Sequence, residues 1–179
     1  MYKLRELERV DLEYINKCRN DPNLIAFLGA PYRYINEDVD CEWYENYLHT
    51  RNNSVRCVIV NDEDVVLGLI SLMDIDNINR TGVIHIMIGG TDNRGRGIGT
   101  FAVTEMIKHA FYNLNLRRIE LDVLENNLPA IRLYEKIGFV KEGVKRESNY
   151  KNGKYINMIL MALLRDDYEQ NNAVYEEKV

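Results

Sequence analysis

The stretch GVIHIMIGGTDNRGRGIGT, residues 82–100, contains the local pattern that decides the fold. It begins as a short apolar strand and then concentrates positive charge, Arg94 and Arg96, among alternating glycines, Gly95, Gly97 and Gly99. The residues after it place apolar side chains at helical spacing. A strand, a glycine-rich loop and a helix in this order present free backbone N–H groups to an anion. We expect that anion to be a phosphate.

The rest of the chain sets limits on its partners. With 179 residues, of which 46% are hydrophobic, it fits one globular domain. The formal net charge of -5 argues against general nucleic-acid binding. The three cysteines are scattered, so no disulfide framework and no metal site is expected. Because neither a signal peptide nor a membrane span is apparent, we expect a cytoplasmic protein without a membrane partner.

Hydrophobic periodicity gives an alternating order of strands and helices. We expect strands at 2–7, 55–61, 65–75, 82–89 and 117–123, helices at 36–51, 98–114 and 127–137, and a final hairpin turning at Asn152-Gly153. This order predicts a mixed α/β (α+β) sheet with helices on both faces. We expect residues 1–165 to form a single domain, and the polar segment 166–179 to be a surface helix or a frayed tail.

Two familiar phosphate loops do not fit the glycine-rich stretch. A P-loop would need Gly-Lys followed by Ser or Thr, and the dinucleotide fingerprint needs a different glycine spacing. The pattern that fits is Arg-x-x-Gly-x-Gly, formed by Arg94, Gly97 and Gly99. A second motif, NNLPAIRLYEKIGF at residues 126–139, follows with one strand between.

Together the two motifs resemble the GNAT superfamily of acetyl-coenzyme A-dependent N-acetyltransferases, and the resemblance covers most of the chain. Within that superfamily it is strongest to bacterial spermidine/spermine N-acetyltransferases and ribosomal-protein N-terminal acetyltransferases. The resemblance implies a mostly antiparallel sheet of about six to seven strands that splays between the fourth and fifth. It also implies acetyl-coenzyme A as co-substrate, and we further expect a homo-oligomer, a dimer or larger.

The resemblance assigns residues to the coenzyme. The pyrophosphate is expected on the N–H groups of the loop, and the thioester carbonyl on a backbone N–H near Met87 and Ile88. Asn127 matches the family position that binds the coenzyme's arm, although it also reads as a helix N-cap. The loop residues expected at the pyrophosphate are Arg94, Gly95, Arg96, Gly97, Ile98, Gly99 and Thr100.

Tyr134 matches the family's proton donor to the leaving thiolate, and a phenol with a pKa of about 10 is protonated at neutral pH. The base that accepts the amine's proton has three candidates: Asp122, His85 or a chain of water molecules. Many relatives carry a glutamate where Val83 stands, so a direct carboxylate base is not indicated by the motif.

The resemblance leaves the acceptor open among a polyamine, a protein N-terminus and an amino sugar. The acidic, aromatic segment 36–49 is a candidate for attracting a cationic amine. Against a polyamine, Gly29 and Ala30 stand where an acidic pair is expected, and Ser71 replaces a glutamate. The alternative to an enzyme is a coenzyme A-binding regulatory module without turnover.

Overall fold

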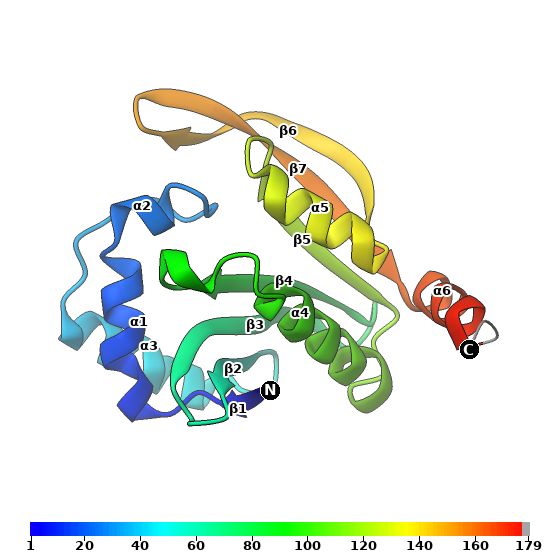
Figure 1. Cartoon of the computed structure of the whole chain (residues 1–179), viewed down its shortest axis with the longest axis horizontal. Coiled ribbons are helices and arrows are strands. Elements are labelled where there is room, and N and C mark those ends of the chain that lie inside the picture. Colours follow the sequence, from blue (N-terminus) through cyan, green and yellow to red (C-terminus); the bar gives the residue numbers. More distant parts are fainter. Residues whose placement is uncertain (177–179) are drawn as a thin grey trace.

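The computed structural model describes residues 1–176 and shows one sheet flanked by helices (Figure 1). The strands are β1 (Tyr2–Glu6), β2 (Val55–Asn61), β3 (Val66–Asp76), β4 (Thr81–Ile88), β5 (Arg118–Leu124), β6 (Val140–Lys151) and β7 (Lys154–Leu164). The helices are α1 (Leu12–Arg19), α2 (Pro22–Ile25), α3 (Glu37–His49), α4 (Ile98–Lys108), α5 (Leu128–Ile137) and α6 (Arg165–Glu176).

The seven strands lie in the order β1-β2-β3-β4-β5-β7-β6, and all neighbours are antiparallel except β4 and β5. That parallel pair is short, joining Thr81–Val83 of β4 to Arg118–Glu120 of β5. Beyond Val83 and Glu120 the two strands no longer pair, although β4 continues to Ile88 and β5 to Leu124. The mixed, mostly antiparallel sheet and the splay between its fourth and fifth strands are therefore confirmed.

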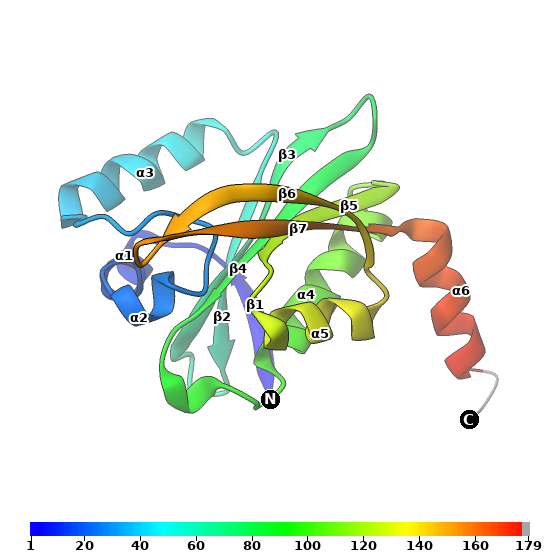
Figure 2. The same cartoon turned by 90° about the horizontal axis from the view of Figure 1, so that it is seen from above.

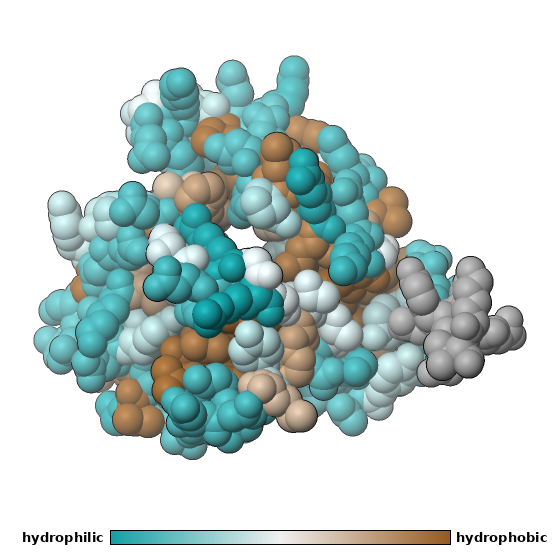
Figure 3. Space-filling model, in the orientation of Figure 1, coloured by the Kyte–Doolittle hydropathy of each residue, from teal (hydrophilic) through white to brown (hydrophobic). Residues whose placement is uncertain are grey.

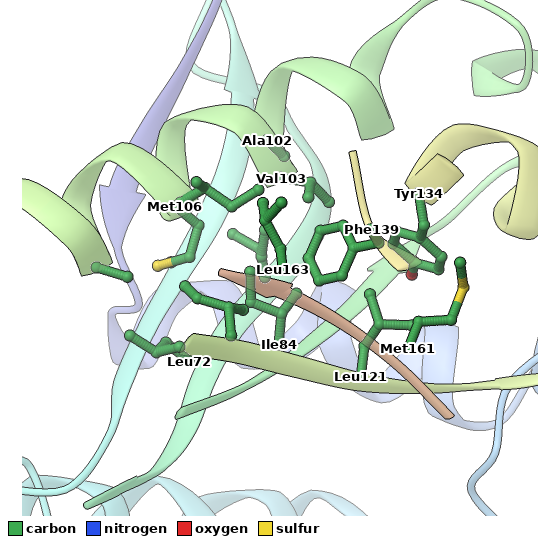
Figure 4. Close-up of a cluster of buried hydrophobic side chains, with 14 of the residues drawn as sticks. Leu72, Ile84, Ala102, Val103, Met106, Leu121, Tyr134, Phe139, Met161 and Leu163 are labelled. Atoms are coloured by element: carbon green, nitrogen blue, oxygen red, sulfur yellow. The ribbon is translucent and has the colours of Figure 1, made fainter. Parts of the chain in front are cut away.

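Helices cover both faces of the sheet, as expected (Figure 2). On one face, α4 and α5 close a core that includes Ile84, Met106, Phe111 and Leu163, several of whose side chains appear in Figure 4. On the other face, α1 and α3 cover a smaller core around Ile15. Alternate residues of β4 feed the two cores, because successive side chains of a strand point to opposite faces.

Helix ends follow the sequence signals. The Asn36 side chain accepts a hydrogen bond from the N–H of Val39, and α5 ends at Gly138, whose φ of 114° favours glycine. Of the two alternatives for the polar C-terminal segment, the helix is found, and the Tyr168 ring packs against Phe111 with 5.7 Å between centroids. Residues 177–179 of that segment lie outside the described part, and a domain boundary at residue 165 stays a prediction.

Candidate active site

The glycine-rich loop joins β4 to α4 and leaves its backbone open. Gly95 and Gly97 have φ values of 73° and 78°, a region that side chains disfavour, and a Cβ on either would meet no atom within 4 Å. In the described part of the chain, the N–H groups of residues 95–100 donate no hydrogen bond, and the first helical bond runs from Phe101 to Gly97. Open space beside free N–H groups at a helix N-terminus fits a pyrophosphate.

Gly99 has a different reason to be glycine. It is buried in the first turn of α4, where a Cβ would lie 2.8 Å from Cδ1 of Leu133 on α5 and 3.4 Å from Cδ1 of Ile88. Its missing side chain lets the two helices approach each other. Ile98 is also buried, so both residues can offer an anion only their backbone.

The two loop arginines differ in their surroundings. The Arg94 guanidinium lies 5.0 Å from the centre of the Phe27 ring, which comes from the segment after α2. Arg96 is exposed, and its carbonyl accepts a 3.4 Å hydrogen bond from the Tyr2 hydroxyl. Thr100 is half-buried in the first turn of α4, which directly follows the loop. Both arginines bring positive charge to the loop, and Arg94 is the one with a defined aromatic support.

Where β4 and β5 separate, the structure contains a cavity of about 470 Å³. Figure 3 shows the molecule hollowed between the part formed by α1 and α2 and the part formed by α5. The walls come from the segment after α2, from β3, β4 and β5, from α5 and from β7; they include Leu28, Gly29, Ala30, Ser71, His85, Ile86, Met87, Asp122, Leu124, Asn127, Tyr134 and Met158. The splay thus opens a space lined by most of the residues expected to carry the chemistry.

One backbone N–H that the family resemblance implied for the thioester is directed away from this space. Gly89 donates its N–H to the carbonyl of Leu67, which shows that the polar groups of Gly89 face β3. Backbone direction alternates along a strand, so the N–H of Met87 also faces β3. The N–H of Ile88 faces the opposite side, toward the splay. Of the two candidates, Ile88 therefore offers the donor, and Met87 contributes its side chain to the cavity wall.

Tyr134 lies on α5, with its ring 5.7 Å from that of Phe139 in an edge-on arrangement (Figure 4). The side chain is buried, with 8% of the residue exposed, yet it lines the cavity. Burial raises the pKa of Tyr134 to about 12, so the phenol keeps its proton at neutral pH. Within the described residues its hydroxyl makes no hydrogen bond, which leaves the proton free for a reacting group.

Asn127 has two structural roles. Its side-chain oxygen accepts from the N–H of Ala130 at 3.3 Å, which caps α5. Its amide nitrogen donates to the carbonyl of Phe27 at 2.9 Å and so ties the α2 segment to α5. The N-cap that the sequence indicated is present. One N–H of the amide is left for a bound arm.

His85 and Asp122 each lie two residues beyond the last β4–β5 pair, Val83 and Glu120, where the strands have separated, and both line the cavity. His85 is exposed toward the cavity, yet partial desolvation by the protein around it, with the charge of Arg56, lowers its pKa, while the charges of Asp74 and Asp122 act in the opposite direction. A lowered pKa keeps the imidazole neutral at pH 7, the form that accepts a proton. Asp122 has a partner already: Lys145 of β6 donates to its carboxylate at 2.6 Å.

The acidic helix α3 does not contribute to this cavity. Asp40 is buried and accepts hydrogen bonds from Arg19 and from Asn16, so its charge is compensated inside the protein. Trp43 packs under the Arg56 guanidinium, 4.2 Å from the ring centre. No α3 residue lines the cavity wall. Asp40 and Trp43 therefore serve the fold, while attraction of the amine by the exposed acids of this segment, Glu37, Asp38 and Glu42, stays a prediction.

Two contributors escaped the sequence reasoning: Phe27 and Lys145. Phe27 lies 67 positions before the arginine that it supports, and Lys145 lies 23 positions after its carboxylate. Neither has a local signature, because an exposed lysine on a strand and an aromatic after a short helix are both common. Asp74, whose charge acts on His85, has a φ of 51° at the irregular end of the β3–β4 pairing.

Comparison with known proteins now defines the class. Residues 2–140 match the family model of the acetyltransferase (GNAT) domain, and the chain belongs to this family. It uses acetyl-coenzyme A and is an N-acetyltransferase; nothing supports a module without turnover.

Individual relatives are N-acetyltransferases that align over most of this chain. A spermidine N(1)-acetyltransferase of Vibrio cholerae is 32% identical over 92% of this chain and 94% of its own length. An L-amino acid N-acetyltransferase of Escherichia coli is 31% identical over 90% of this chain and 97% of its own. The crystal structure of the Vibrio cholerae spermidine N-acetyltransferase with CoA and spermine superimposes with a TM-score of 0.88, at 31% identity, over 94% of this chain and 98% of that one.

Two searches of the described residues were negative. No helix among them is long and apolar enough to cross a membrane. No group of three or more histidine, cysteine, aspartate or glutamate side chains among them is arranged to hold a metal ion.

Proposed function

We propose that this protein transfers the acetyl group of acetyl-coenzyme A to a primary amine of a polyamine such as spermidine. The observation that carries the proposal is the Asp122 carboxylate, which lines the cavity together with the His85 imidazole. A carboxylate attracts an alkylammonium group, and a neutral imidazole beside it offers an acceptor for the ammonium proton. The spermidine acetyltransferases among the relatives support the same acceptor.

The residues for the coenzyme are those of the β4–α4 loop. The free N–H groups of residues 95–100 would hold the pyrophosphate, and Arg94 would add a charge-assisted hydrogen bond. The N–H of Ile88 would polarise the thioester carbonyl, and Asn127 has one amide N–H left for the arm. When bound, acetyl-coenzyme A supplies an activated acetyl group and a thiolate as leaving group.

Proton movement follows from the side chains of the cavity. An alkylammonium with a pKa of about 10 must lose a proton before its nitrogen can attack. Neutral His85 accepts that proton, directly or through water. Asp122 forms an ion pair with Lys145 and serves to attract the ammonium. Tyr134 gives its proton to the departing thiolate, since burial keeps it protonated.

The experiment that tests this function is thiol release from acetyl-coenzyme A with a panel of amines. The panel contains spermidine, spermine, a peptide with a free N-terminus, glucosamine and several L-amino acids. We expect the highest kcat/KM with the polyamines, and a KM for spermidine that rises with salt because charge attraction is screened. A higher kcat/KM with another amine would move the acceptor assignment to the class of that amine. A KM for spermidine that does not change with salt would contradict recruitment by charge. Homo-oligomer formation and a cytoplasmic location stay predictions.

A further inference from the structure

The ion pair between Asp122 and Lys145 lies at the wall of the acceptor cavity, and the proposed reaction does not use Lys145. The Nζ of Lys145 is 2.6 Å from the carboxylate of Asp122. Lys145 stands opposite Met158 in the β6–β7 register, and Met158 stands opposite Leu124 of β5. Both Met158 and Leu124 line the cavity, so the lysine reaches Asp122 along the same face of the sheet.

The group that Lys145 offers to Asp122 is a primary alkylammonium. A polyamine offers the same group. The pair is partly exposed, with 53% of the Lys145 side chain and 35% of the Asp122 side chain accessible, and such pairs are weak enough to exchange partners. The lysine stem extends from a strand at the edge of the sheet and can turn toward solvent without disturbing the core.

We propose that Lys145 is a specificity-determining residue: it occupies the Asp122 carboxylate when no acceptor is bound, and the ammonium of the acceptor must displace it. This proposal rests on the proposed function, because it takes Asp122 as the carboxylate that attracts the amine. The lysine raises the concentration of cationic amine that the enzyme needs. A neutral substitute at position 145 therefore improves apparent affinity for a cationic acceptor.

The size of the effect follows from competition for one carboxylate. An exposed ion pair of ordinary strength lowers the apparent affinity of a competing ammonium by a factor of about two to six. Lys145→Met should lower the KM for spermidine by that factor. Lys145→Arg keeps the competing charge and should leave the KM unchanged or raise it.

The control variant is Lys141→Met on the same strand. Lys141 is also exposed, carries the same charge, and makes no ion pair within the described residues. If the lysine acts through general repulsion of cations, both methionine variants will lower the KM alike. If Lys145 acts through Asp122, only Lys145→Met will lower the KM. In an Asp122→Asn background, adding Lys145→Met will then leave the calorimetric Kd for spermidine unchanged.

The outcomes separate the inference from the function on which it rests. Wild-type protein that turns over spermidine, with an unchanged KM in Lys145→Met, overturns the role of Lys145 and leaves the function intact. Wild-type protein that does not turn over spermidine overturns both. A lower KM in Lys145→Met alone, lost in the Asp122→Asn background, supports the proposal.

Discussion

Replacement of Tyr134 by phenylalanine removes one proton donor and almost nothing else. The ring stays in place between α5 and Phe139, because its packing does not depend on the hydroxyl. Within the described residues that hydroxyl makes no hydrogen bond, so its loss should change the free energy of unfolding by less than about 1 kcal/mol. A positioned general acid contributes about 10²–10⁴-fold in rate. We expect kcat to fall by that factor, with the affinity for acetyl-coenzyme A nearly unchanged.

The assay is single-turnover thiol release at saturating coenzyme and amine, where the chemical step limits. Tyr47→Phe is the matched control: Tyr47 is also buried, but its hydroxyl donates to Glu6 at 3.0 Å and lies away from the acceptor cavity. That variant should lose about 0.5–1.5 kcal/mol of stability and keep its turnover. A Tyr134→Phe enzyme with the wild-type single-turnover rate would refute the assignment, and the thiolate would then take its proton from water.

Three further predictions concern the loop and the base. Gly99→Val should lower the free energy of unfolding by about 1–3 kcal/mol, and with it the Tm, because the valine side chain would collide with Leu133. An unchanged Tm would mean that α4 and α5 are not in tight contact at this position. Arg94→Ala should weaken acetyl-coenzyme A binding about tenfold in calorimetry, and equal affinity would remove this arginine from the coenzyme site. His85 must be neutral to accept a proton, and its pKa is lowered, so wild-type kcat/KM should fall only as the pH drops below about 6.5. His85→Asn should be slower and lose this acidic limb, whereas His109→Asn should retain it; a limb that persists in His85→Asn would assign the proton to another group.

Much of the fold was predictable because its signals are local. Each of these signals acts over only a few residues: the apolar alternation of β4, the N-cap Asn127 and the helix-ending Gly138. The two family motifs add the strand–loop–helix and helix units on either side of β5. The splay between β4 and β5 was expected from the family resemblance, whereas the parallel pairing of these two strands comes from the structure. Periodicity alone gives strands and not their neighbours.

The site was less predictable because it is assembled from distant segments. Segment 27–30 forms one wall of the cavity; its composition does not indicate this, and only the family comparison drew attention to Gly29 and Ala30. The carboxylate of Asp40 looked available from its acidic neighbours, yet it is buried against Arg19. Conversely, Asp122 looked like a free base and is paired with Lys145. Ionic partners are set by the tertiary fold, and a single sequence does not reveal them.

The measurement that tests the central claim most directly is mass analysis of spermidine after incubation with the protein and acetyl-coenzyme A. We predict that spermidine gains one acetyl group on a primary amine, at a rate that saturates with both substrates and falls strongly in Tyr134→Phe. Spermidine that stays unmodified while the same protein acetylates an amino acid, a peptide N-terminus or an amino sugar would contradict the claim.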